Sequence, residues 1–289
     1  MGLVDLSAAA LRSITGLMVR HHILQIDPNT LETLNKVNFA KEFPGDAKIK
    51  FTTAHPQRTD EGSVINISVT HAQKSTYDVI EIPPSTGKQG EHPLEGGKLL
   101  CSIPPTSGVA YIHSFCITEN YVVVPETPLV LNLWEAYTRR FKDSSAAEWF
   151  QWKENQRSRF HVVDRKQGSY AGIFTADPFF VFHQVNAFED DGKIFLDACC
   201  FHDHKIIDQT YLHNMRSPIV PGEKKLDVPD VRRYELPLED LGDVKAGVPI
   251  KKKDDGLDYT LLHSGMEFPK LNDMENNGKR YKFVYGVGS

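Results

Sequence analysis

Alternating apolar and polar residues recur along the chain in short runs that predict β-strands. The clearest run covers residues 63–70, where Ile65, Ile67 and Val69 alternate with polar side chains. Because successive side chains of a strand point to opposite faces, this period predicts a strand with one buried face. Similar runs predict strands at residues 77–82, 98–103, 121–124, 160–165, 193–199, 206–213, 231–238 and 281–286.

Two segments instead have the pattern of helices. Residues 129–141 predict a helix that covers a loop, and the apolar run from Ala8 to Leu11 gives residues 1–20 a helical pattern. We therefore expect a divergent, helix-like segment at residues 1–22 and one β domain at residues 23–289. Residues 189–192, an acidic run that ends in glycine, are expected to form a hairpin turn.

The number and spacing of the strands predict an all-β fold. Many short strands, little helix and loops rich in proline and glycine are typical of sandwiches and propellers. A recurrence of about 50 to 70 residues favours a β-propeller with four-stranded blades over a sandwich. The strands suffice for roughly four blades, with short helices and loops on one face.

The composition is that of a globular protein that does not bind nucleic acid. The 289 residues are 40% hydrophobic and 25% charged, the net charge is −5, and Asp254 and Asp255 neutralise the basic cluster at Lys251 to Lys253. A nucleic-acid surface needs clustered basic residues. No run of about 18 apolar residues predicts a transmembrane helix. Four cysteines without CxxC spacing suit a reducing compartment.

Three histidines lie within segments that otherwise have the pattern of buried strands. His55, His113 and His183 recur at long, similar intervals. Neutral imidazole is the commonest protein ligand for metals, and ligands so far apart in sequence must come from separate strands that converge. Taken singly, a buried histidine is more often a hydrogen-bonded core residue than a metal ligand.

The segments around these histidines form a set of motifs. The motifs are Thr53-Ala54-His55-Pro56, Tyr111-Ile112-His113-Ser114-Phe115, Phe182-His183-Gln184-Val185-Asn186-Ala187-Phe188-Glu189-Asp190, Val231-Arg232-Arg233-Tyr234 and Met266-Glu267-Phe268-Pro269. In sequence and order they resemble the carotenoid cleavage oxygenase family, over a stretch from about residue 23 to residue 289. The third motif is most similar to animal β-carotene oxygenases of the eccentric-cleaving 9′,10′ branch, and the visual-cycle retinoid isomerohydrolase is a more distant relative.

The resemblance implies a metalloenzyme on a seven-bladed propeller. It implies that His55, His113 and His183 are three of four ligands of a ferrous ion, and that Glu267 orients His183 from outside the ligand set. A metal-bound histidine needs its second ring nitrogen engaged to fix its tautomer and ring angle. The implied activity is a non-haem iron(II)-dependent dioxygenase reaction that cleaves a C=C bond of a carotenoid to apocarotenals or retinal. A carotenoid or retinoid and O2 would be its substrates.

Two departures from the family pattern affect this interpretation. Met18-Val19-Arg20 stands where relatives carry the glutamate expected behind His113, and the sequence stops before the region expected to hold the fourth histidine. We therefore expect a partial chain, matching about the middle half of a family member, that holds iron substoichiometrically and does not cleave carotene by itself. The alternatives are a non-catalytic remnant that binds carotenoids or isoprenoids, and a retinoid isomerohydrolase-like activity.

The resemblance also bears on location. A cytoplasmic protein with peripheral membrane contact is expected, because the substrate dissolves in lipid, and a mitochondrial location is the alternative. The apolar residues from Leu129 to Trp134 could form the membrane-contacting surface, but a helix covering the core explains them equally well.

Overall fold

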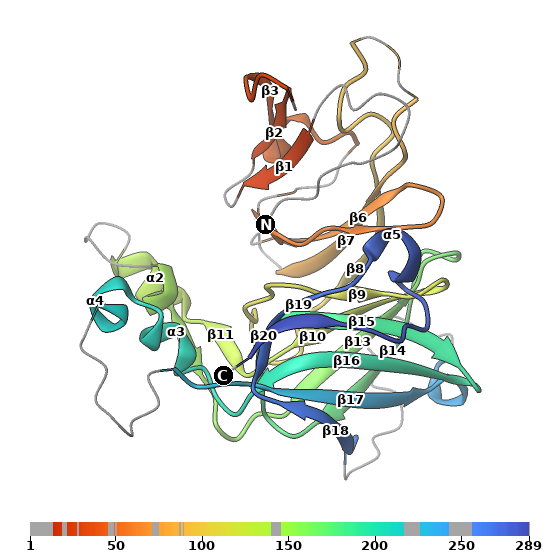
Figure 1. Cartoon of the computed structure of the whole chain (residues 1–289). Helices are drawn as coiled ribbons and strands as arrows, with labels where there is room; N and C mark the ends of the chain where they lie inside the picture. The colour runs from red at the N-terminus through yellow and green to blue at the C-terminus, as the bar shows by residue number, and fades with distance from the viewer. Residues whose placement is uncertain are drawn as a thin grey trace.

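Antiparallel β-sheets dominate the structure, a computed structural model. It describes residues 14–18, 22–27, 29–45, 49, 51–70, 75–86, 88, 90–139, 146–216, 226–242 and 256–288. Figure 1 shows the sheets stacked along the molecule, with β1 to β3 at one end and β17 and β18 at the other. The all-β prediction is confirmed, whereas closure into a propeller stays a prediction.

The first two sheets come from the N-terminal third of the chain. One sheet contains β1 (Ile14–Met18), β2 (His22–Ile26) and β3 (Thr33–Asn38), and helix α1 (Phe39–Glu42) follows it. The next has the order β4-β6-β7-β8, and β5 also pairs with β6. Its strands are β4 (Phe51–Thr52), β5 (Gln57–Arg58), β6 (Val64–Thr70), β7 (Thr76–Ile82) and β8 (Lys98–Ile103).

Two further four-stranded sheets follow. The first has the order β14-β13-β10-β9, with β9 (Cys116–Ile117), β10 (Tyr121–Glu126), β13 (Ser158–Asp164) and β14 (Ser169–Ala176). The second runs in chain order, with β15 (Phe180–Asp190), β16 (Lys193–Phe201), β17 (Asp230–Pro237) and β18 (Tyr259–Ser264).

Smaller elements border these sheets. Strands β11 (Leu129–Leu131) and β12 (Phe150–Trp152) pair with each other, as do β19 (Met266–Lys270) and β20 (Tyr285–Gly288). The helices are α2 (Leu133–Arg139), α3 (Ile206–Gln209), α4 (Leu212–Met215) and α5 (Asp273–Asn276), with 3-10 turns η1 (Ala146–Trp149) and η2 (Leu238–Asp240).

The core lies between stacked sheets, and β10 belongs to two apolar layers at once. Val122 and Val124 pack in one cluster with Ile65 and other residues of the β4–β8 sheet, whereas Val123 packs in a second cluster with residues of β15 and β16. All three valines are fully buried. Since both faces of β10 are covered, its sequence is a continuous apolar run and not an alternating one.

The hairpin between β15 and β16 has the predicted turn. Asp190 pairs with Lys193, so Asp191 and Gly192 form a two-residue loop. Both have positive φ, 45° and 70°. This conformation matches the right-handed twist of the flanking strands and favours glycine and aspartate.

Two element predictions in the middle of the chain are wrong. Residues 129–141 are not one helix: Leu129–Leu131 pair as a strand, and helix α2 begins only after Asn132. The Asn132 Oδ1 atom accepts hydrogen bonds from the backbone N–H groups of Trp134 and Glu135, at 3.1 and 3.2 Å. An asparagine in that position is a helix N-cap, which fixes where the helix starts.

Residues 206–213 do not form a strand either. They contain α3 and the start of α4, and only Ile206 among the residues of these two helices is buried. The Asp203 carboxylate accepts a hydrogen bond from the Lys205 N–H at 2.9 Å, which closes a turn before α3. The apolar pair at Ile206 and Ile207 therefore anchors a helical turn against the Phe180 and Phe201 cluster.

The chain ends also depart from the sequence predictions. Residues Ile14–Met18, expected to be helical, form strand β1, while residues 1–13 and 19–21 lie outside the described residues. The strand expected at residues 281–286 begins only at Tyr285. The basic cluster at Lys251 to Lys253 also lies outside the described residues.

A buried ionic cluster fixes the loop that leads to His113. Glu126, fully buried on β10, accepts hydrogen bonds from Arg159 Nη1 at 3.2 Å and from the Thr106 N–H at 3.0 Å, and its Oε2 lies 3.2 Å from His161 Nε2. The other ring nitrogen of His161 lies 2.9 Å from the Tyr170 hydroxyl. The hydrogen bonds of Glu126 keep its pKa below the ordinary value despite burial.

Replacing Glu126→Ala should therefore destabilise the fold strongly. The substitution leaves His161 and Arg159 without their buried partner, and breaking such a pair costs about 3 to 5 kcal/mol. Urea unfolding measures the change in the free energy of unfolding. Glu119→Ala, at a side chain that is 78% exposed, is the matched control and should change stability by less than about 0.5 kcal/mol. Equal effects of the two substitutions would contradict the structural role of Glu126.

Candidate metal centre

The structure brings together the three histidines that the sequence singled out. One ring nitrogen from each of His55, His113 and His183 lies within 4.8 Å of those of the other two. The Nε2 atoms of His55 and His113 are 3.0 Å apart. The ring centroids are 4.7 Å apart for His55 and His113, and His183 lies 5.0 Å from each. Among the described residues, this is the group of metal-ligating side chains that is close enough to hold one ion.

His55 lies in the short connection between β4 and β5, and Asn66 of β6 holds that connection. Asn66 Nδ2 donates to the Thr53 carbonyl oxygen at 3.1 Å, and Asn66 Oδ1 accepts from the Thr53 hydroxyl at 2.7 Å. The Thr53 N–H also donates to the Ile67 carbonyl. These bonds satisfy buried polar groups and fix the backbone two residues before His55.

His113 lies in an extended segment between the isolated bridge at Ala110 and strand β9. The Tyr111 N–H donates to the Leu129 carbonyl at 2.8 Å, which ties this segment to β11. The Tyr111 hydroxyl lies 2.9 Å from His113 Nδ1. Because the Nδ1 side of the ring is engaged, Nε2 remains the atom that faces the other histidines.

His183 lies at an interruption in the pairing of β15 with β16. The register shifts between Val181 and Gln184 and again between Gln184 and Asn186. Each shift is a β-bulge, which bends the strand and redirects a side chain. The Nδ1 atom of His183 lies 2.7 Å from Glu267 Oε2 on β19, so Nε2 again remains for the centre.

Burial keeps two of the histidines neutral. Desolvation first, and the neighbouring imidazoles second, lower the pKa of His113 to about 3 and that of His55 to about 4. A neutral imidazole presents a free lone pair to a metal, whereas a protonated ring cannot bind one. The site thus contains nitrogen donors ready for an ion without first losing protons at neutral pH.

The donor set suits a divalent transition metal. Imidazole nitrogens bind zinc, copper, iron and nickel, and Tyr111 and Glu267 engage the outer nitrogens as such sites require. The Glu267 Oε1 atom is buried without a hydrogen-bond partner, while its other oxygen engages His183. A carboxylate held in this way offsets positive charge arriving at the centre.

Sequence reasoning identified Glu267 but not Tyr111. The expected carboxylate position behind His113 falls on residues 18–20, of which 19 and 20 lie outside the described residues. The phenol of Tyr111 engages His113 instead. Its pKa is raised to about 12 by burial, so the hydroxyl stays protonated. The signal was present in the sequence, because residues two apart on extended backbone point to the same face.

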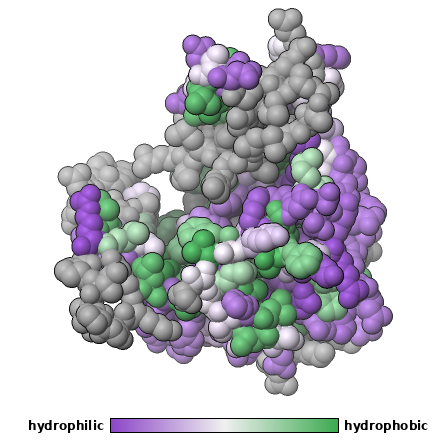
Figure 2. Space-filling model, in the orientation of Figure 1, coloured by the Kyte–Doolittle hydropathy of each residue, from purple (hydrophilic) through white to green (hydrophobic). Residues whose placement is uncertain are grey.

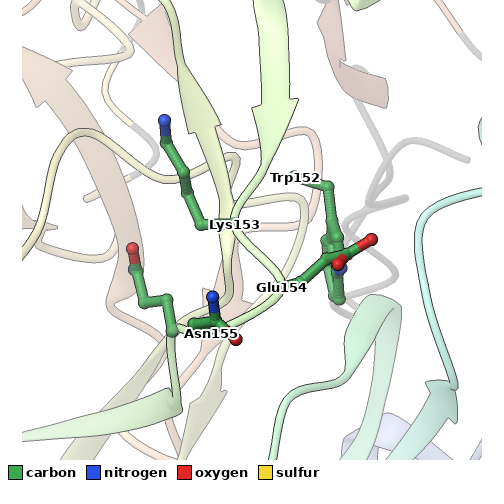
Figure 3. Close-up of a pocket in the computed structure, with 5 residues that line it drawn as sticks. Trp152, Lys153, Glu154 and Asn155 are labelled. Atoms are coloured by element: carbon green, nitrogen blue, oxygen red, sulfur yellow. The ribbon is translucent and has the colours of Figure 1, made fainter.

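A shallow depression after β12 is a separate feature and contains none of the three histidines. Trp152, Lys153, Glu154, Asn155 and Gln156 line it. In Figure 3, Trp152 and Glu154 extend to one side of the connection and Lys153 to the other, so the polar groups do not converge. Trp152 stacks on His204 with ring centroids 5.3 Å apart. The depression thus lacks the convergent polar groups of a ligand site.

The comparison with protein families agrees with this geometry. The family model described as RPE65, retinal pigment epithelial membrane protein, matches residues 17–289. The chain belongs to this family. It comprises the carotenoid oxygenases, so the resemblance drawn from the motifs is confirmed, and homologues of this chain are named as dioxygenases.

Curated relatives match most of the chain. Beta,beta-carotene 15,15'-dioxygenase of Rattus norvegicus is 32% identical over 92% of this chain and 50% of its own length. Mitochondrial carotenoid-cleaving dioxygenase of Mustela putorius furo is 32% identical over 91% of this chain and 53% of its own length. The chain therefore spans about half the length of the curated relatives it matches.

Solved structures share the fold. A crystal structure of an ACO/RPE65 chimera superposes with a TM-score of 0.67 at 22% identity, covering 96% of this chain and 52% of the other. Cobalt-substituted Synechocystis ACO gives a TM-score of 0.66 at 22% identity with the same coverage. At this identity the likeness concerns the fold.

The lowered pKa values predict that the metal-free chain loses stability in acid. As the pH falls below 6.5, the unfolded state protonates His113 while the folded state, with a pKa of about 3, does not. Unfolding then takes up a proton, so the free energy of unfolding falls with pH. In His113→Gln the loss between pH 7 and pH 5 should be about 1 to 2 kcal/mol smaller than in the unmodified chain.

Urea unfolding of the metal-free chain at the two pH values measures this difference. His263→Gln is the control, because His263 is exposed on β18 and its removal should leave the loss unchanged. A His113→Gln chain that loses as much stability in acid as the unmodified one would show that His113 is not shielded from protonation.

Proposed function

We propose that the chain holds iron(II) through His55, His113 and His183 and serves the oxidative cleavage of a C=C bond of a carotenoid, yielding apocarotenals or retinal. The observation that carries the proposal is the convergence of three imidazoles from separate parts of the fold, two of them, His55 and His113, kept neutral by burial. Such a site leaves coordination positions open. Bound ferrous iron would supply the binding and activation of O2.

The chain's own residues would position the ion and the substrate. Glu267 and Tyr111 would hold the rings of His183 and His113 in the tautomer that presents Nε2. The Phe182 ring lies 5.3 Å from the His113 ring, and the Phe268 ring lies 5.3 Å from His183. Aromatic surfaces beside the histidines suit an apolar, conjugated substrate. No described side chain is assigned as an acid, base or nucleophile.

The names of the relatives support carotenoid cleavage as the class of reaction, but they do not all specify which C=C bond is cleaved. The rat relative is named for cleavage of beta,beta-carotene at 15,15', while the ferret relative is named only as carotenoid-cleaving and mitochondrial. We extend the proposal to a β-propeller domain over residues 23–289, with blades formed by the four-stranded sheets, after a divergent segment at residues 1–22. Cobalt in the Synechocystis relative supports a site that accepts divalent transition ions.

Metal binding should disappear when one of the three histidines is removed. His183→Ala should weaken the binding of Fe2+, titrated without oxygen, by more than about 100-fold, since loss of an outer partner alone costs 10 to 100-fold. The control is His263→Ala on exposed strand β18, which should bind as the unmodified chain does. Equal binding by His183→Ala would contradict the site.

Product analysis with a carotenoid then tests the reaction. Cleavage gives two carbonyl fragments, and their masses identify the bond. Retention of intact polyene by the iron-loaded chain would instead support a non-catalytic carotenoid- or isoprenoid-binding function. Isomerised retinol, formed with the free fatty acid by hydrolysis of a retinyl ester and without cleavage of a C=C bond, would support the isomerohydrolase-like alternative.

A membrane surface is proposed around α2 and α4. Trp134 is 71% exposed and Tyr137, Leu212 and Met215 are also exposed. Figure 1 shows α2 and α4 on the same side of the molecule, and Figure 2 shows a few hydrophobic residues beside hydrophilic ones there. No helix among the described residues has both the length and the apolarity to span a bilayer. Peripheral contact of a cytoplasmic or mitochondrial protein fits an amphipathic surface of this kind.

Removing apolar surface from α2 and α4 should weaken binding to lipid. The double substitution Trp134→Asp and Leu212→Asp should lower the fraction of protein that floats with phosphatidylcholine liposomes several-fold, because each change replaces a lipid-facing apolar group by a charge. Leu34→Asp on β3 is the control, since Leu34 is also exposed but lies on the N-terminal sheet. Unchanged flotation of the double variant would remove the membrane surface from the proposal.

A further inference from the structure

Ser114, the residue after His113, hydrogen-bonds both backbone groups that flank His183. Its Oγ donates to the Phe182 carbonyl at 2.6 Å and accepts from the Gln184 N–H at 3.0 Å. Ser114 is 5% exposed, so the hydroxyl is shielded from water that could replace it. One buried side chain therefore joins the backbone that carries one histidine to the backbone that carries another.

The position of these bonds on β15 gives them their significance. The C=O of one residue and the N–H two residues later lie on the same edge of a strand. The Phe182 C=O and the Gln184 N–H both bond Ser114, and β15 has no neighbouring strand in its sheet other than β16. The Ser114 hydroxyl thus satisfies two backbone groups of β15 that a neighbouring strand would otherwise bond.

The same residues coincide with the irregular part of β15. The first register shift falls between Val181 and Gln184, the interval that contains His183. A bulge leaves a strand locally without its full ladder of hydrogen bonds and lets it bend. Without a second restraint, the direction of the His183 side chain would be poorly fixed.

We propose that Ser114 is a positioning residue that clamps the bulge around His183 and so fixes His183 relative to His113 for metal binding. The inference rests on the proposed metal site. Tyr111 and Glu267 orient the imidazole rings, whereas Ser114 would fix the backbone that carries His183. The ring centroids of His113 and His183 are 5.0 Å apart and the ring planes meet at 82°. This is the relative placement of the two rings that the Ser114 clamp would maintain.

The test compares Co2+ affinity and the Co2+ visible absorption spectrum among serine variants. Ser114→Ala should weaken Co2+ binding about 10 to 100-fold, the range for loss of a group that orients a ligand, and should shift the absorption bands. Ser114→Thr, which keeps the hydroxyl, should restore both. A spectrum and affinity unchanged in Ser114→Ala would overturn the proposal.

Ser158→Ala is the matched control. Ser158 is fully buried and its Oγ bonds both the N–H and the C=O of Phe179, at 3.1 and 3.3 Å, so its loss removes a comparable pair of bonds. Phe179 packs in the apolar cluster between sheets and not at the bulge. If Ser158→Ala lowered Co2+ affinity as much as Ser114→Ala, the effect would be general loosening, and the proposal would fail.

Two further measurements keep the outcomes distinct. If Ser114→Ala does not fold, Ser114→Cys is scored in its place, because a thiol of similar size makes only weak hydrogen bonds: weakened Co2+ binding supports the clamp, and unchanged binding overturns it. Hydrogen exchange of the Gln184 amide in the metal-free chain reads the clamp directly, and faster exchange in Ser114→Ala supports it. Absence of Co2+ binding by the unmodified chain, with the Gln184 amide still protected, would overturn the metal site and with it the positioning role, while leaving the hydrogen bonds established.

Discussion

The candidate centre depends on sheets that cannot slide past one another. His55 and His113 lie in connections beside different sheets, and His183 lies on the terminal strand of a third. The sheets are joined by two apolar clusters that share strand β10. Because burying one large apolar side chain contributes about 1.5 to 3 kcal/mol, a slip that exposed several would cost a free energy comparable to the whole stability of an ordinary domain. The distance between the imidazoles is therefore a property of the core.

The regular strands could be predicted because the alternation of apolar and polar residues in their sequence matches the two faces of a strand. The alternation of Ile65, Ile67 and Val69 gave strand β6 almost to its ends, and the strand predicted at residues 98–103 coincides with β8. The failures have local causes. Asn132 starts helix α2 by capping it, and Asp203 closes the turn before α3; neither effect is visible in hydrophobic periodicity.

The candidate site was predictable in its histidines and less so in what surrounds them. The motifs identified His55, His113, His183 and Glu267, since each lies in a short sequence whose resemblance could be recognised. Tyr111 was not assigned a role, although it lies two residues from His113. The partner of buried His161 was missed as well, because Glu126 is distant in sequence and only the pairing of β10 with β13 brings them together.

The groups that engage the second ring nitrogens of His183 and His113 differ in charge. Glu267 can carry a full negative charge beside His183, while the Tyr111 phenol, with its pKa raised to about 12, is neutral beside His113. For Nε2 of His113 to hold an ion, Nδ1 must carry the proton, so the Nδ1–H would donate a hydrogen bond to the Tyr111 phenol oxygen. In the proposed site, the imidazole backed by the carboxylate would then be the more basic ligand.

The irregularity of β15 allows one strand both to pack in the core and to present the candidate ligand His183. The two register shifts are each one residue, so together they restore the original phase, and Val181 and Ala187 face the same apolar cluster on either side of the gap. A single shift would have turned one half of the strand inside out. Within the first shift, between Val181 and Gln184, the backbone directs His183 toward the other imidazoles but gives up pairing with β16. Backbone groups that lose their strand partner while buried must find another hydrogen-bond partner. Ser114, which follows His113, provides it for Phe182 and Gln184. The same side chain therefore satisfies the backbone of β15 and, in the proposed role, fixes the distance between His113 and His183.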